Sequence, residues 1–254
     1  MRSYNQFCPI AKAAEIFCER WTALILRDLA FGATRFSELQ RGVPLASPTL
    51  LSSRLKKLEA EGVIVRSVSD DGRGPTYRLT HAGKEFVPII MALGEWGQRW
   101  SRRTLAEHEV DLGLLLWALQ KGAHPELFGT ERVVIQFELT DQAENKRHWW
   151  FLNQDGTCEL CLKPPDRDAQ LYVIVSLIDL TRIWRGDLPF ASALHHGAIE
   201  LDGSARLRKV FPLWLGISPL AHIRSERREP SARSYTSWTP RSRSGGKTEH
   251  DRRR

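Results

Sequence analysis

The side chains best placed for chemistry lie between Ser47 and Gly62, in the stretch SPTLLSSRLKKLEAEG. Ser47 suits a helix N-cap, Pro48 suits the first turn, and Gly62 suits the left-handed residue that follows a helix. The spacing therefore predicts one helix with marked ends. Its apolar stripe consists of Leu51, Leu55 and Leu58.

The other side of this helix carries short hydroxyls and cations. At about 100° per residue, this side takes Thr49, Ser52, Ser53, Lys56 and Lys57, and Arg54 flanks the apolar stripe. Short polar side chains let a helix backbone approach a DNA groove closely, and Lys or Arg then meets phosphate or guanine. The alternative is a solvated amphipathic helix, which would be the better interpretation of an isolated helix. The neighbouring elements decide between the two.

The neighbours favour DNA. Strand signals at 63–68 and 76–79 flank a turn at 70–74, which predicts a hairpin wing directly after the helix. Arg73 lies between two glycines at the tip, where it would reach a minor groove or a phosphate; the alternative is an ordinary solvated arginine. Upstream, 35–40 predicts a short helix joined by a turn to the marked helix, which is a helix-turn-helix arrangement.

Two further helices are expected at 8–18 and 21–31, and a long one at 81–101. The long helix has large apolar side chains along one side: Phe86, Ile90, Leu93, Trp96 and Trp100. Two indoles exceed what a small domain needs internally, so we predict a dimer interface there, together with 10–17. The alternative is that the indoles pack on a second domain of the same chain.

The rest of the sequence offers no catalytic set. His195 and His196 have no carboxylate or cysteine nearby at ligand spacing. Cys158 and Cys161 are three apart in a predicted strand, so they face opposite sides, and no second such pair exists. We therefore expect no metal, no cofactor and no enzyme activity.

Charge divides the chain into three. Residues 1–103 hold 16 Lys and Arg against 10 Asp and Glu, 104–223 hold 11 against 16, and 224–254 hold 10 against 4. The balances are +6, −5 and +6. A basic first part suits a polyanion, and the acidic middle part suits another task. We expect a DNA-binding and dimerisation domain at 1–103, a second domain at 104–223 and a disordered basic tail.

The second domain should be an α+β fold. Strand signals at 132–139, 148–152, 157–162 and 171–176 are followed by helical periodicity at 177–185, 190–195 and 205–214. The simplest packing is an antiparallel sheet covered by helices. Four cysteines in 254 residues and the lack of a long apolar segment favour a cytoplasmic protein without membrane insertion.

The ordered succession CPIAKAAEIF, WTALILRDLAFG, RFSELQRGVPLASPTLLSSRLKKLEAEGVI and LTHAGKEFVPIIMALGEWGQRW resembles the HxlR-type winged helix-turn-helix transcriptional regulators, over 7–103. The resemblance implies a homodimer on a pseudo-palindromic operator of double-stranded DNA, with 47–58 as recognition helix. It also marks Cys8 as a thiol that senses oxidants or electrophiles in some members. A helix N-terminus favours negative charge, which suits that role, but Cys8 as a small packing residue is the stronger alternative.

The stretches WWFLNQDGTCELCL and LTRIWRGDLPFASALHHGAIELDGSARLRKVFPLWLG resemble the sterol-carrier-protein type domain, over 130–217. This implies an apolar tunnel for a hydrophobic effector. The overall expectation is an α+β protein, a winged helix-turn-helix followed by a sterol-carrier-like domain, acting as a transcriptional regulator modulated by a hydrophobic small molecule or by thiol oxidation. The alternative function is a lipid or small-molecule carrier whose winged helix serves for dimerisation.

Overall fold

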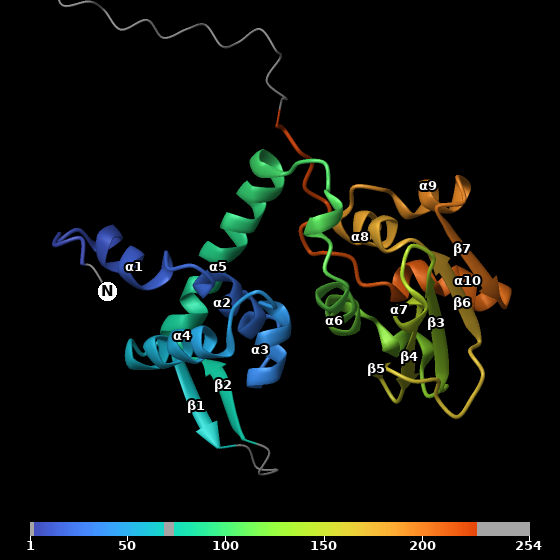
Figure 1. Ribbon diagram of the computed structural model, residues 1–254, viewed down its shortest axis with the longest axis horizontal. Helices are drawn as coiled ribbons and strands as arrows, with labels where there is room; N and C mark the ends of the chain where they lie inside the picture. The colour runs from blue at the N-terminus through green and yellow to red at the C-terminus, as the bar shows by residue number, and fades with distance from the viewer. Residues whose placement is uncertain (1–2, 69–73, 228–254) are drawn as a thin grey trace, which may run out of the picture.

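A computed structural model describes residues 3–68 and 74–227 of the chain. Two hydrophobic cores organise these residues, one among the N-terminal helices and one beneath a five-stranded sheet. Figure 1 shows the two parts side by side, with helix α6 between them.

The N-terminal part is a helical cluster with a two-stranded hairpin. Its elements are α1 (Pro9–Phe17), α2 (Thr22–Ala30), α3 (Phe36–Gly42), α4 (Pro48–Ala60), β1 (Ile64–Val68), β2 (Pro75–Leu79), α5 (His81–Trp96) and a π-helical turn (Gly97–Ser101). The predicted helices and both wing strands are therefore present, with ends shifted by a few residues. The core is mainly aliphatic and gathers the inward faces of α2, α3 and α4, together with the aromatic side chains of Tyr77 and Trp117.

The C-terminal part is an α+β unit. Two 3₁₀ turns (Glu107–Glu109 and Pro125–Phe128) flank α6 (Leu112–Gly122). The strands are β3 (Val133–Leu139), β4 (His148–Gln154), β5 (Thr157–Cys161), β6 (Leu171–Val175) and β7 (Ile199–Gly203). The remaining helices are α7 (Glu144–Arg147), α8 (Leu177–Arg185), α9 (Phe190–His195) and α10 (Ala205–Trp214).

The sheet is mixed, which corrects the predicted antiparallel sheet. Its strand order is β5-β4-β3-β6-β7, and β3 pairs with β6 in parallel, with Phe137 opposite Val173. The β4–β5 hairpin is added on one side of β3, so the chain must cross over before β6 can pair on the other side. Strand β7, which the sequence analysis did not identify, closes the far edge.

Aromatic side chains fill the inner face of this sheet. Phe137, Phe151, Phe211 and Trp214 are fully buried, and the rings of Phe211 and Trp214 lie 5.6 Å apart. The Trp214 indole donates a hydrogen bond of 2.7 Å to Oδ1 of Asn153, the buried polar residue at the centre. These rings explain the aromatic richness of the sequence by core packing.

Helix α6 joins the two cores. Its Leu115, Leu116 and Leu119 pack beneath the sheet, while Trp117 packs among the N-terminal helices. An ion pair of 3.4 Å between Lys121 and Glu38 ties the same helix to α3. Trp117 lies beyond the predicted boundary at residue 103, so the N-terminal core is completed by a side chain from the second part.

Candidate nucleic-acid interface

Helix α4 has the predicted caps and the predicted apolar stripe. The Ser47 hydroxyl accepts a hydrogen bond of 3.2 Å from the Leu50 amide, and Gly62 has a φ of 69° just past the helix end. The stripe of Leu51, Leu55 and Leu58 is at most 1% exposed. These contacts fix which side of the helix faces out.

The outward side carries Thr49, Ser53 and Lys56, all exposed. Because they are spaced by four and three residues, they form one row opposite the leucines. Ser52 is half-buried at the edge of this row, and Ser47 is exposed at its N-terminal end. The row is short, polar and cationic, as a groove-binding surface requires.

Two of the predicted DNA contacts, Arg54 and Lys57, are engaged within the domain. Arg54 pairs with the Glu19 carboxylate, and the Lys57 ammonium lies 3.1 Å from the same carboxylate and donates to the Glu15 carbonyl at 2.7 Å. Both side chains are about one-fifth exposed and lie against the α1–α2 turn. They anchor α4 to the domain, so the polar face is narrower than helical spacing predicts.

The wing carries two further cations. Arg66 and Arg78 are exposed, one on each strand of the hairpin, although the sequence analysis did not single them out. Cations on both arms of a hairpin that follows a recognition helix are the signal that would have found them. Arg73 falls outside the described residues. In Figure 1 α4 and the wing lie together, at the end of the molecule away from the sheet.

A buried carboxylate on α2 lies against the end of α3, the first helix of the motif. Asp28 on α2 is fully buried and accepts a hydrogen bond of 2.8 Å from Arg27, whose guanidinium also donates to the Gly42 carbonyl at 3.1 Å. A Cβ at Gly42 would approach the Asp28 carboxylate to 1.7 Å, so only glycine fits there. Burial raises the pKa of Asp28 to about 6, although the positive charge and the hydrogen bond of Arg27 act to lower it.

This raised pKa predicts a pH effect on stability. The native state holds the Asp28 proton to higher pH than the unfolded chain, whose pKa is near 3.8. The free energy of unfolding therefore falls as pH rises from about 4 to about 6, by roughly 3 kcal/mol in total from this group. In Asp28→Asn this contribution should be absent, which urea unfolding at pH 4.5 and pH 7 measures. If the wild type and Asp28→Asn differed in free energy of unfolding by the same amount at both pH values, the raised pKa of Asp28 would be contradicted. Asp168→Asn, at an exposed position, is the matched control.

The predicted dimer side chains divide into two groups. The rings of Phe86 and Phe17 stack with their centroids 3.5 Å apart, and Ile90 packs against the N-terminal core. These two side chains therefore make part of their contacts within their own subunit. Leu93, Trp96 and Trp100 are 57%, 57% and 45% exposed. About half of each indole is therefore accessible on the described residues, which leaves an apolar surface available for a dimer contact.

The cysteines differ in surroundings. Cys8 occupies the N-cap of α1, is half-buried, and makes no side-chain capping hydrogen bond. Burial raises the pKa of Cys158 to about 12, so this thiol stays protonated. Within the described ranges, no three His, Cys, Asp or Glu residues come together as a metal site.

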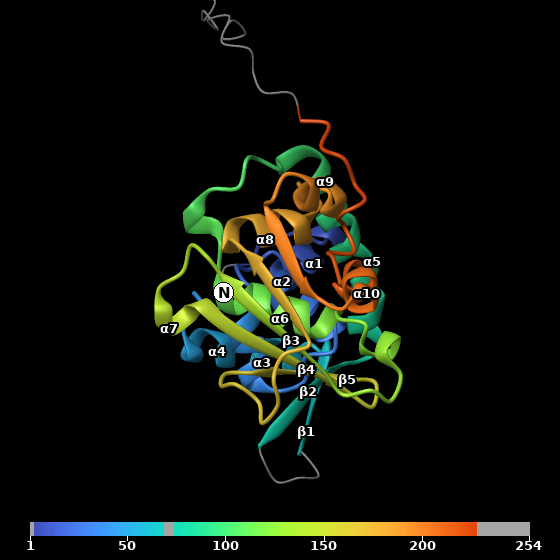
Figure 2. The ribbon, with the colours of Figure 1, turned by 90° about the vertical axis from the view of Figure 1, so that its right-hand side faces the viewer.

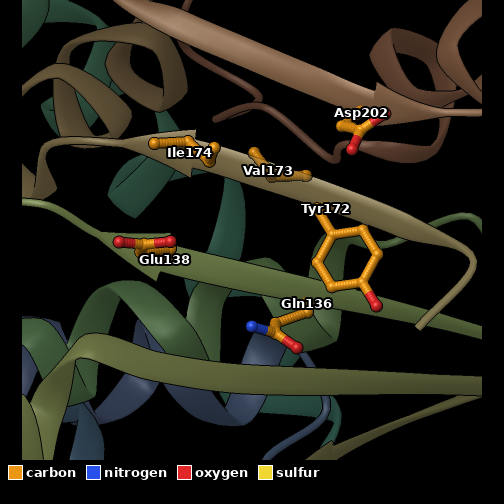
Figure 3. Close-up of a pocket in the computed structure, with 6 residues that line it drawn as sticks. All are labelled: Gln136, Glu138, Tyr172, Val173, Ile174 and Asp202. Carbon is orange, nitrogen blue, oxygen red and sulfur yellow. The ribbon is translucent and has the colours of Figure 1, made fainter. Parts of the chain in front are cut away.

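The open face of the sheet has a small hollow of about 210 Å³. In Figure 3 Gln136 and Glu138 of β3 lie beside Tyr172 of β6, and Asp202 of β7 lies above them. Figure 2 shows this side of the strands turned away from α6. It is a shallow, partly acidic surface, unlike the enclosed apolar tunnel that the sterol-carrier resemblance implies. No helix in the described part of the chain combines the length and apolarity needed to cross a lipid bilayer.

Comparison with known proteins agrees with this geometry. Residues 16–105 match the model of the HxlR-like helix-turn-helix family. Over 98 residues the chain is 40% identical to YvaP of Bacillus subtilis, an uncharacterized HTH-type transcriptional regulator, covering 38% of this chain and 91% of that protein. The chain belongs to the HxlR-like helix-turn-helix family. It is therefore a DNA-binding transcriptional regulator by family.

Two further matches are similar in extent. An uncharacterized HTH-type regulator of Methanothermobacter thermautotrophicus is 35% identical over 94 residues, covering 37% of this chain and 72% of that protein. The structure of "Redox regulator HypR in its oxidized form" is 28% identical with a TM-score of 0.36, over 39% of this chain and all of that one. Each of these matches covers about two-fifths of this chain.

Proposed function

We propose that this HxlR-like protein binds a palindromic operator as a homodimer, with α4 in the major groove and the wing on the adjacent backbone. The observation that carries this proposal is the outward row of Thr49, Ser53 and Lys56, exposed on α4 opposite its buried leucines. A two-fold dimer through α5 would set two such rows about 34 Å apart, one helical turn of DNA. Arg66, Arg73 and Arg78 of the wing would then contact phosphate or the minor groove.

We also propose that 104–223 is a sterol-carrier-like effector domain and that 224–254 is a separate basic tail. A mixed sheet with helices on its inner face supports an independent α+β unit. Its contact with the winged helix through Trp117 and Lys121 supports coupling, since a change in one part moves a helix held by both. Oxidation of Cys8, at the N-terminal end of α1 beside the proposed dimer surface, would be a second signal that regulates DNA binding.

The test is DNA retention by Thr49→Ala with Lys56→Ala. A random-sequence library selected on the wild-type protein supplies the operator, and a titration then compares the variants. Loss of one base contact and one phosphate contact in each subunit should weaken specific binding by roughly 100-fold or more, with a shallower salt dependence. Thr130→Ala with Lys209→Ala, exposed on the other part, is the matched control.

The outcomes separate the two proposed functions. Unchanged operator affinity in Thr49→Ala with Lys56→Ala would rule out α4 as the recognition helix and favour the small-molecule carrier. Repeating the titration after diamide treatment tests the thiol input. A response that is identical in Cys8→Ser would rule out Cys8 as the sensor.

A further inference from the structure

A hollow of about 1160 Å³ lies where three segments meet: the linker after α5, the end of α8 and the chain at 221–227. Its volume is comparable to or larger than that of typical small-molecule sites. In Figure 1 these segments meet at the opposite end of the molecule from the wing. DNA seated on α4 would therefore not reach it.

Unpaired cations line this hollow. Arg103, Arg224 and Arg227 contribute to its wall, and no ion pair joins any of them to a carboxylate of the described residues. The other two arginines of the wall are engaged, Arg102 with Asp187 and Arg182 with Asp179. Three guanidinium groups that line one hollow, with no ion-pair partner in the part of the chain that the structure describes, are suited to a carboxylate or phosphate, which Arg binds through paired N–H donors.

The remaining wall is mixed: Thr104, Asp187 and Ser225 line it together with apolar residues, and Asp187 is the partner of Arg102. Leu105, Ile178 and Ile223 face the same hollow, and Ile223 is only 8% exposed. A simple inorganic anion would leave these side chains against water. A ligand with an aliphatic body and an anionic head would cover them and neutralise the arginines together.

The segment at 221–227 that lines the hollow is tied to the π-helical turn after α5 and to the linker. The Glu226 amide donates to the Arg99 carbonyl at 2.8 Å, and the two side chains pair at 3.3 Å. Arg102 donates to the Ile223 carbonyl at 3.4 Å. Arg99 follows directly on the helix that carries the exposed Trp96, so a ligand that moved this segment would act on the end of the proposed dimer surface.

We propose that this hollow is the effector site and that its ligand is an amphipathic anion, an aliphatic chain with a carboxylate or phosphate head. This proposal rests on the proposed function only in calling the ligand an effector. The binding site itself stands on the arginines and the apolar residues of the wall. It differs from the tunnel that the sterol-carrier resemblance implies, because the sheet interior is filled by the aromatic rings of the core.

Calorimetric titration of the full chain tests the site. The ligands are dodecanoate and dodecyl phosphate, which separate the two head groups, with dodecyl maltoside as an uncharged chain and inorganic phosphate as a head without a chain. We expect at least one anionic chain to bind at least tenfold more tightly than either control. Arg103→Gln with Arg224→Gln should weaken that binding by roughly 10- to 100-fold, the effect of losing charge-assisted hydrogen bonds.

The matched control is Arg167→Gln with Arg208→Gln, two exposed arginines away from the hollow. Equal weakening in the control pair, or equal binding of dodecyl maltoside, would overturn the proposal, as would tight binding of inorganic phosphate alone. If Arg103→Gln with Arg224→Gln lost operator affinity but bound dodecanoate and dodecyl phosphate as the wild type does, the arginines would be assigned to DNA instead. If the Thr49 and Lys56 variant fails its own test, the regulator proposal falls and the titration result still stands.

Discussion

Trp117→Ala is expected to lower the free energy of unfolding by about 3 to 5 kcal/mol, the cost of removing a large buried aromatic side chain. Trp117 is 6% exposed and completes the N-terminal core, although it belongs to α6, whose leucines serve the other core. The substitution therefore leaves a cavity at the contact between the two parts. Urea unfolding followed by circular dichroism measures the loss.

Trp117→Phe is the matched variant. It keeps most of the ring volume and removes the indole N–H, which is buried and has no hydrogen-bond partner among the described residues. Removing an unsatisfied buried donor offsets part of the packing loss, so we expect less than half of the alanine effect. If Trp117→Ala unfolds like the wild type, the two cores are not joined through α6.

Local chemistry made the winged helix predictable. Ser47 and Gly62 mark the ends of α4 through a capping hydroxyl and a left-handed residue, and both act within a few residues of the chain. The leucine stripe then determines the outward face. What the helical period could not predict was the pairing of Arg54 and Lys57 with Glu19, because that carboxylate lies 35 and 38 residues away in sequence.

The C-terminal part was less predictable for a related reason. Strand pairing is non-local, so four strand signals did not show that β3 and β6 run in parallel. Strand β7 was not predicted because its sequence IELDG contains Asp, Gly and Glu, which are depleted in strands. Helix α6 has apolar side chains on both sides, so its stripe alone could not predict that Trp117 faces the other core.

Leu93→Lys with Trp96→Lys is expected to convert the proposed dimer into a single chain of 29.0 kDa. Both side chains are 57% exposed on α5, beside Trp100 and Ile89, so they form an apolar surface that the described residues leave uncovered. Two ammonium groups per subunit would have to be desolvated to form the interface, which costs more than the lost apolar contact contributes. Sedimentation velocity measures the mass directly.

The same variant separates dimerisation from DNA contact, because neither residue lies on α4 or the wing. A dimer engages two half-sites at once, so losing it should weaken operator binding by roughly 10²- to 10⁴-fold while single half-site binding stays unchanged. Leu162→Lys with Leu213→Lys, exposed apolar residues of the C-terminal part, is the matched control and should keep the dimer mass. A persistent dimer in Leu93→Lys with Trp96→Lys would place the subunit interface elsewhere and leave the exposed indoles of α5 for another partner.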